Sequence, residues 1–226
     1  MSTTEPRRGL FITFEGIDGS GKTTQMRLLA GALRAEGRDV VENYEPGGTP
    51  IGTQIRRILL DAANQALSPT AELLLYFASR AQNVDELIQP ALRAGKIVLS
   101  DRFTDSTLVY QGVGRGLGKD VVLSLDAVAC RGLAPDLTLL IDIDLETSLG
   151  RAHSRNRSLQ ENGALAETRM DDQAVDFHRR VHDAYAELVR SEPARFAVID
   201  GRCDIAAVAR DVWEAVAERL LKAKHV

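Results

Sequence analysis

The chain has few cysteines, no long apolar run and no excess of positive charge, and each absence excludes a class of protein. Its two cysteines, Cys130 and Cys203, are far apart and follow no metal-ligand spacing, so we expect reduced thiols and no disulfide framework. No apolar run approaches the roughly 20 residues of a membrane span. Residues 1–8 lack the apolar segment of a signal peptide, and we expect them to form a short disordered tail. These absences favour a cytoplasmic protein with no membrane partner.

The charge balance argues against a nucleic-acid partner. The 28 Lys and Arg residues are outnumbered by 32 Asp and Glu residues, which gives a net charge of −4, whereas a nucleic-acid binder normally carries a basic face. With 226 residues and 44% hydrophobic composition, the chain can bury one substantial core. A single domain over residues 1–226 is the simplest interpretation.

Short apolar runs alternate with longer helical patterns, which predicts βαβ units and an α/β fold with a parallel sheet. The five candidate strands are Leu10–Glu15, Asp39–Tyr44, Lys96–Ser100, Leu137–Asp142 and Phe196–Ile199. Helices are expected near residues 21–36, 51–63, 69–94, 119–132, 145–155, 169–190 and 204–223. Ser68 before Pro69 and Asp144 before Leu145 resemble helix starts.

A complete phosphate-binding loop follows the first candidate strand. Residues 16–23 have the pattern G-x-x-x-x-G-K-T, and a helical pattern that ends near Gly37 comes directly after them. Backbone N–H groups of such a loop and the helix N-terminus face the phosphates of a nucleotide. Lys22 is expected to reach the β- and γ-phosphates, and the Thr23 hydroxyl to ligate Mg²⁺. A chance glycine-rich turn is the alternative, but the strand and helix on either side favour a nucleoside triphosphate site, with ATP-binding residues Gly16, Ile17, Asp18, Gly19, Ser20, Gly21, Lys22, Thr23 and Thr24.

Two further segments carry polar groups where a ligand would bind, beyond the carboxyl ends of the strands. The segment 45–50 reads EPGGTP, and Arg56 follows it closely enough to face the same cleft. Asp101 and Arg102 end the third candidate strand, where a carboxylate orients Mg²⁺ and an arginine clamps phosphate. Taken alone, these segments also fit an ordinary turn and a surface ion pair.

One aromatic and one basic side chain share a face of the expected helix 69–94. Tyr76 and Arg80 are four residues apart, and such a pair suits a nucleobase through stacking and hydrogen bonding. An aromatic residue at this spacing is also common in a protein core. His178 and His182 have the same spacing, but no third metal ligand is evident, so a solvated helix face is the better interpretation.

Taken together, the motifs closely resemble those of bacterial thymidylate kinases. The matching segments are FEGIDGSGKTT (14–24), EPGGTPIGTQIRRILL (45–60), LLYFASRAQNV (74–84), SDRFTDSTLVYQGVGRG (100–116), APDLTLLID (134–142) and a weaker match over 168–185. The resemblance implies the P-loop NTPase fold with a five-stranded parallel sheet, transfer of the ATP γ-phosphate to dTMP, and a homodimer. The first motif is shared with other small P-loop kinases, but the EPGG, DR and YQG series is not. A regulatory GTPase is disfavoured because its guanine-reading Asn-Lys-x-Asp motif is absent.

The resemblance also implies roles for individual residues. Asp18 would meet the deoxyribose 3′-OH or Mg²⁺. Arg56 and Arg102 would hold the dTMP phosphate. The acidic pair Glu45 and Asp101 would order magnesium waters or the phosphate-binding arginines. The base would be bound by Tyr76, Arg80, Thr107 and Gln111.

The chain departs from the family pattern mainly in a polar stretch expected to form a mobile lid at about residues 151–169. The phosphate loop has no basic residue between Gly16 and Gly21, and relatives of that kind place the arginine in the lid, which favours Arg151 and Arg155 as catalytic. The alternatives are Arg157 and Arg169, the latter in a Thr-Arg pair where the family has Asp-Arg. A plain surface insertion is the other interpretation of this stretch. The stacking position, commonly Phe, is Tyr76.

Arg155 is the first choice for the lid arginine, because it follows Arg151 by one helical turn. We expect Arg155→Ala to lower kcat by roughly 10³-fold, since an arginine that neutralises the transferring phosphoryl group acts mainly in the transition state. The Kd for dTMP should stay within a few-fold when measured by calorimetry. A variant with normal kcat would transfer the role to one of the other three arginines.

Overall fold

The computed structural model describes residues 8–151, 154, 169–170 and 173–224. The expected N-terminal tail lies almost wholly outside these residues, as do Arg155, Arg157 and most of the expected lid. The helix expected at 145–155 is present as far as residue 151.

The five expected strands form one parallel sheet, as predicted. The strands are β1 (Phe11–Glu15), β2 (Val40–Tyr44), β3 (Ile97–Asp101), β4 (Leu137–Asp142) and β5 (Phe196–Asp200). Their order across the sheet is β2-β3-β1-β4-β5, with every neighbouring pair parallel. The central strand β1 therefore lies between β3 and β4, and the loops that follow β1 and β3 leave the sheet side by side.

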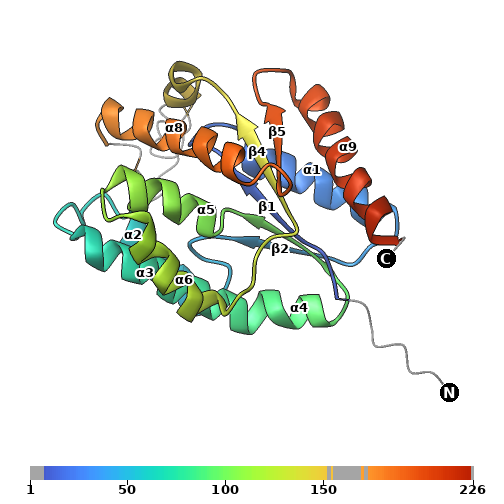
Figure 1. Cartoon of the computed structure of the whole chain (residues 1–226), viewed down its shortest axis with the longest axis horizontal. Coiled ribbons are helices and arrows are strands. Elements are labelled where there is room, and N and C mark those ends of the chain that lie inside the picture. Colours follow the sequence, from blue (N-terminus) through green and yellow to red (C-terminus); the bar gives the residue numbers. More distant parts are fainter. Residues whose placement is uncertain (1–7, 152–153, 155–168, 171–172, 225–226) are drawn as a thin grey trace.

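Helices cover both faces of the sheet (Figure 1). One face is packed by α1 (Lys22–Ala35) and α9 (Ile205–Lys224), whose apolar residues contact Ile12 and Phe14 of β1. The other face is covered by α2 (Pro50–Leu60), α3 (Pro69–Asn83), α4 (Gln89–Arg93), α6 (Lys119–Cys130) and α8 (Val175–Ser191). Side chains alternate along a strand, so Thr13 and Glu15 point to this second face together with Phe11. Both are completely buried.

Helix starts agree with the sequence better than helix interiors. The Ser68 hydroxyl accepts a hydrogen bond from the Ala71 N–H, and Asp144 accepts one from the Thr147 N–H, so both expected N-caps are confirmed. The helix expected at 69–94 is confirmed over residues 69–93, but it contains a π-helical turn η1 (Val84–Ile88) between α3 and α4 that the sequence did not predict. The helix expected at 169–190 begins only at Val175, and that expected at 51–63 ends at Leu60.

Two short elements after β3 were not predicted. They are the helix α5 (Thr104–Thr107) and the π-helix η2 (Leu108–Gly114). Every residue from 105 to 114 is buried except Val113, which is partly exposed. Among the described helices, none is both long and apolar enough to cross a bilayer.

Candidate functional site

A cavity of about 790 Å³ opens beyond the carboxyl ends of β1, β2 and β3. It contains eleven of the residues singled out from the sequence, namely Asp18, Lys22, Thr23, Glu45, Arg56, Tyr76, Arg80, Asp101, Arg102, Thr107 and Gln111. The phosphate loop, the segment after β2, α3 and η2 thus contribute to one space. A nucleotide-sized ligand fits a cavity of this volume.

The phosphate loop turns tightly between β1 and α1. Gly16 has φ +136°, and a Cβ there would lie 2.4 Å from the carbonyl oxygen of Ile141, so only glycine fits. Lys22 Nζ donates to the Ile17 carbonyl at 2.9 Å. Burial, together with the nearby Arg102 guanidinium, lowers the pKa of Lys22 to about 8. The lysine is therefore a buried cation whose contacts are with neutral oxygens, as a site for an anion requires.

Thr23 and Asp101 lie together at the edge of the cavity. The Thr23 hydroxyl donates to the Asp101 carboxylate, which joins the start of α1 to the end of β3. A hydroxyl and a carboxylate are the hard oxygen ligands that Mg²⁺ prefers. The described residues form no group of three or more His, Cys, Asp or Glu side chains suited to a metal. The pair therefore fits a Mg²⁺ ion that keeps waters and phosphate oxygens as its other ligands.

Arg102 directly follows β3, beside the neighbouring strand β1. Its backbone has φ +72°, an uncommon left-handed conformation for a residue other than glycine. This turn directs the guanidinium to Asp18, whose carboxylate accepts from Nη2 at 2.6 Å, and to the Ser106 hydroxyl at 2.9 Å. Tyr110 donates to the same Asp18 at 2.9 Å, and its ring lies 4.9 Å below the guanidinium. Strained residues of this kind are typical of functional sites.

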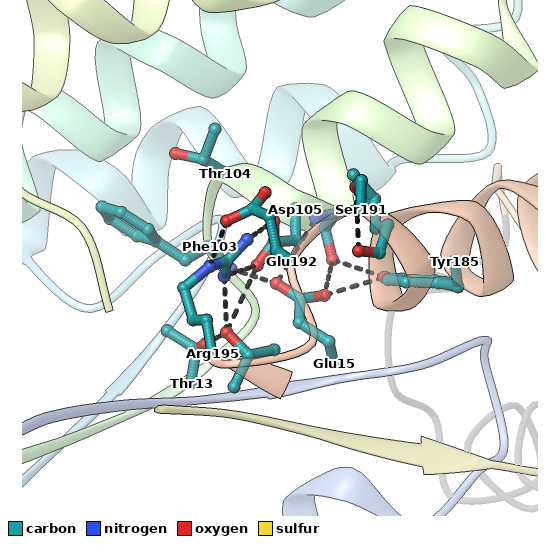
Figure 2. Close-up of polar contacts among 12 residues, drawn as sticks. Thr13, Glu15, Phe103, Thr104, Asp105, Tyr185, Ser191, Glu192 and Arg195 are labelled. Carbon is teal, nitrogen blue, oxygen red and sulfur yellow. Dashed lines mark hydrogen bonds and ion pairs between the residues drawn. The ribbon is translucent and has the colours of Figure 1, made fainter. Parts of the chain in front are cut away.

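Glu15 holds the turn that carries Arg102 from below (Figure 2). Its carboxylate accepts from the Phe103 N–H at 2.8 Å, from the Ser106 hydroxyl at 2.6 Å and from the Tyr185 hydroxyl at 2.8 Å. Burial and the neighbouring Asp105 carboxylate raise the pKa of Glu15 to about 7, against the opposing effect of Arg102. The pKa of this carboxylate thus lies near neutral pH, because burial raises it while the hydrogen bonds from Ser106 and Tyr185 lower it.

The other residues of α5 are also anchored, each to a different element. Figure 2 shows the Arg195 guanidinium facing Asp105, and the two groups form a bidentate ion pair with N···O distances of 2.6 and 2.9 Å. Thr104 donates to Asp126 at 2.5 Å, and Thr107 accepts from Arg80 at 2.9 Å. This four-residue helix is therefore a fixed platform beside Arg102.

Arg80 and Glu45 form a buried ion pair under the expected base pocket. Arg80 Nε donates to Glu45 at 2.7 Å, and Nη2 donates to the Phe103 carbonyl and to Thr107. No described residue accepts from Arg80 Nη1, although this nitrogen is buried and the side chain lines the cavity. Glu45 also accepts from Asn83 at 3.3 Å, and its expected role toward magnesium water stays a prediction.

Tyr76 of α3 and Arg56 of α2 both line the cavity. Burial raises the pKa of the Tyr76 hydroxyl to about 12, so the ring is neutral over the physiological range. No described residue hydrogen-bonds this hydroxyl. Arg56 Nη1 donates to the Pro46 carbonyl at 2.9 Å and its guanidinium lies 5.8 Å from the Tyr44 ring.

The arginines expected in the lid are only partly described. Arg151 donates to the Gly201 carbonyl at 3.4 Å and does not line the cavity. Arg169 is buried, with Nη1 2.7 Å from the Glu72 carboxylate and Nε donating to the Leu59 carbonyl at 2.5 Å. Arg155 and Arg157 lie outside the described residues. The choice among them stays a prediction.

Four residues around Arg102 were not assigned a role from the sequence, namely Glu15, Ser106, Tyr110 and Tyr185. Tyr110 precedes Gln111 in the same segment and was the easiest to find, because an aromatic residue beside a glycine-rich turn at a strand end often borders a ligand site. Glu15 could have been noticed as a charge at the end of an otherwise apolar strand. Ser106 and Tyr185 carry no such signal.

The comparisons with known proteins agree on one family. A sequence model described as thymidylate kinase matches residues 14–212. Thymidylate kinase of Trichlorobacter lovleyi is 49% identical over 93% of this chain and 98% of its own length, and that of Geobacter sulfurreducens is 50% identical over 94% and 98%. The crystal structure of thymidylate kinase from Ehrlichia chaffeensis is 34% identical, with a TM-score of 0.73 over 93% of this chain and 99% of that one.

Proposed function

The chain belongs to the thymidylate kinase family and phosphorylates dTMP to dTDP with ATP, and we propose that the cavity described above is where both nucleotides meet. One observation carries this assignment. The phosphate-loop lysine, Lys22, and a base pocket with the aromatic ring of Tyr76 line the same cavity. A donor phosphate and an acceptor nucleotide therefore reach each other without leaving it.

We propose that the phosphate loop takes the β- and γ-phosphates of ATP and that Lys22 balances their charge. Thr23 and Asp101 would hold Mg²⁺, which when bound neutralises charge on the transferring phosphoryl group. The acceptor is a phosphate oxygen of dTMP, already deprotonated at neutral pH, so no general base is required. The work of the site is positioning and charge neutralisation.

We propose that the acceptor lies along α3 and η2. Tyr76 would stack on thymine, and Arg80 Nη1, which no described residue uses as a donor, would reach an oxygen on the base edge. Arg102 and Arg56 would bind the phosphate of dTMP, and Asp18 would face the sugar beside them. Thr107 and Gln111 complete the pocket, while the lid arginine, Arg151 or Arg155, would cover the phosphates.

We also propose a homodimer formed through α2, α3 and α6, which pack side by side. These three helices carry six exposed large apolar side chains, namely Ile51, Ile58, Leu74, Val121, Leu123 and Val128. Such residues are costly on a free surface and suit contact with a second copy. A cytoplasmic location, where ATP and dTMP occur, is part of the same proposal, and it is supported by the free thiols of Cys130 and Cys203.

A panel of nucleoside monophosphates tests the function. We expect ATP-dependent ADP release with dTMP that exceeds release with dAMP, dGMP and dCMP, because the pocket suits one base. Lys22→Ala is the control, and it should abolish transfer while leaving the circular dichroism spectrum unchanged, since Lys22 acts on charge that develops in the transition state. A parent enzyme most active on another monophosphate, or a Lys22→Ala enzyme within tenfold of the parent, would contradict the assignment.

Tyr76→Ala should weaken dTMP binding by roughly 1–3 kcal/mol, the range for loss of one base–aromatic stacking contact. ATP binding should change much less, because Tyr76 lies in the acceptor pocket. Titration calorimetry with each ligand measures both effects. Tyr76→Phe is the matched control and should bind dTMP as the parent does, whereas equal losses for dTMP and ATP would refute the placement of the base.

Leu74→Glu and Val128→Glu should shift the protein from dimer to monomer in sedimentation velocity, because each places a charge on the proposed interface. Leu74 is 51% exposed and Val128 is 73% exposed. Ile205→Glu is the control, since Ile205 is 61% exposed on α9, on the opposite face of the sheet. An unchanged sedimentation coefficient in both interface variants would place the dimer contact elsewhere or exclude a dimer.

A further inference from the structure

Glu72 is a buried carboxylate that does not line the cavity but contacts a residue that does. It lies in the first turn of α3 and is completely buried. Its Oε1 accepts from Gln111 Nε2 at 2.8 Å. Arg115 donates to both of its oxygens, at 3.2 and 3.0 Å, and Arg169 Nη1 lies 2.7 Å from Oε2. Two cations and one amide therefore surround this carboxylate.

The position of Glu72 on α3 relates it to the base pocket. Glu72, Tyr76 and Arg80 follow each other at intervals of four residues, so they lie along one stripe of the helix. The stacking ring is in the middle of this stripe, with the carboxylate at one end and the guanidinium at the other. Gln111 of η2 approaches the stripe at its Glu72 end.

The charge of Glu72 decides which way the Gln111 amide points. Burial by itself raises the pKa of Glu72, but the hydrogen bonds from Arg115 and Gln111 and the charges of Arg115 and Arg169 outweigh it, and the pKa is lowered. An ionised carboxylate only accepts hydrogen bonds, so the NH₂ group of Gln111 must face it. The opposite orientation would set two oxygens against each other without a proton between them.

The orientation leaves the Gln111 carbonyl oxygen for the ligand. Gln111 lines the cavity although the residue is only 1% exposed, and no described residue donates to its Oε1. Arg80 Nη1 is likewise buried and without an acceptor among the described residues. The pocket thus offers one acceptor and one donor to the edge of a base.

This pair of groups distinguishes pyrimidines by chemistry. Thymine presents N3–H, a donor, next to O4, an acceptor, which complements the oxygen of Gln111 and the nitrogen of Arg80. Cytosine presents the reverse, with N3 as an acceptor and its 4-amino group as a donor. A buried polar group left facing a like partner costs affinity steeply.

We propose that Glu72 is a positioning residue for base specificity, which holds the Gln111 amide so that its oxygen selects a pyrimidine protonated at N3. The inference rests on the proposed function, because it requires the monophosphate base to lie beside Tyr76. Glu72 does not touch the base. It acts through Gln111.

The test compares two substrates that differ only at the 4-position and N3, dTMP and 5-methyl-dCMP. In Glu72→Gln the side chain at position 72 can both donate and accept, so Gln111 is free to turn. The ratio of kcat/KM for dTMP to that for 5-methyl-dCMP should fall by roughly tenfold or more, the typical scale of one misdirected hydrogen bond. Arg80 still favours O4 in this variant, so part of the discrimination should remain.

Two further variants separate orientation from a general loss of structure. The double variant Glu72→Gln with Gln111→Glu places a carboxylate at position 111, which accepts in either orientation, and should restore the ratio. Arg115→Lys leaves Glu72 charged and should keep the parental ratio even where it lowers thermal stability. If Glu72→Gln does not fold, Glu72→Asp replaces it, because the shorter side chain keeps a charge for the arginines but withdraws from Gln111.

The outcomes are distinct. A parent enzyme that leaves dTMP unphosphorylated overturns the proposed function and this inference with it. A parent that is active on dTMP, with a folded Glu72→Gln or Glu72→Asp variant that discriminates as strongly as the parent, overturns the inference alone. A lowered ratio that the double variant restores supports it.

Discussion

The buried carboxylate of Glu15 at the end of the central strand connects the two halves of the site. Glu15 immediately precedes the phosphate loop, and it accepts hydrogen bonds from the backbone and side chain of the turn that follows β3. The same carboxylate accepts from Tyr185 of α8 (Figure 2). Arg102 lies within this turn, so the distance between the phosphate loop and Arg102 is set by Glu15. Because transfer depends mainly on positioning, this spacing is the constraint on which the rest of the site depends.

Burying such a carboxylate is costly, and the structure repeats the arrangement at Glu45 and Glu72. Each of the two accepts a hydrogen bond from a side chain that lines the cavity, Glu45 from Arg80 and Glu72 from Gln111. Removing one partner of a buried ion pair costs about 3–5 kcal/mol, because the other charge is left uncompensated. The buried acids thus restrict Arg80 and Gln111 to one orientation each, and this makes the cavity wall rigid.

The sequence predicted the strands and the loops at their ends because these depend on local patterns. Apolar runs of five or six residues and the glycine spacing of the phosphate loop can be recognised in the sequence alone. The π-helical turn at Val84–Ile88 and the short helix at Thr104–Thr107 were not predicted, because the apolar periodicity of the sequence does not indicate them. The partners of Glu15 were missed for the same reason, since Ser106 and Tyr185 are 91 and 170 residues away in the chain.

The basic side chains around the cavity differ in whether the protein itself supplies a carboxylate as their partner. Arg102 is paired with Asp18, with 2.6 Å between the groups, and Arg80 is paired with Glu45. Among the described residues, by contrast, Lys22 donates to the neutral oxygens of Ile17 and Ser20 and to no carboxylate. Burial disfavours its charged form and lowers its pKa to about 8, whereas a polyphosphate at the loop favours the charged form and raises the pKa again. The cost of burying Lys22 is therefore offset when an anion binds. In the proposed site this difference would direct the most highly charged ligand to the phosphate loop, while the paired arginines would orient the acceptor.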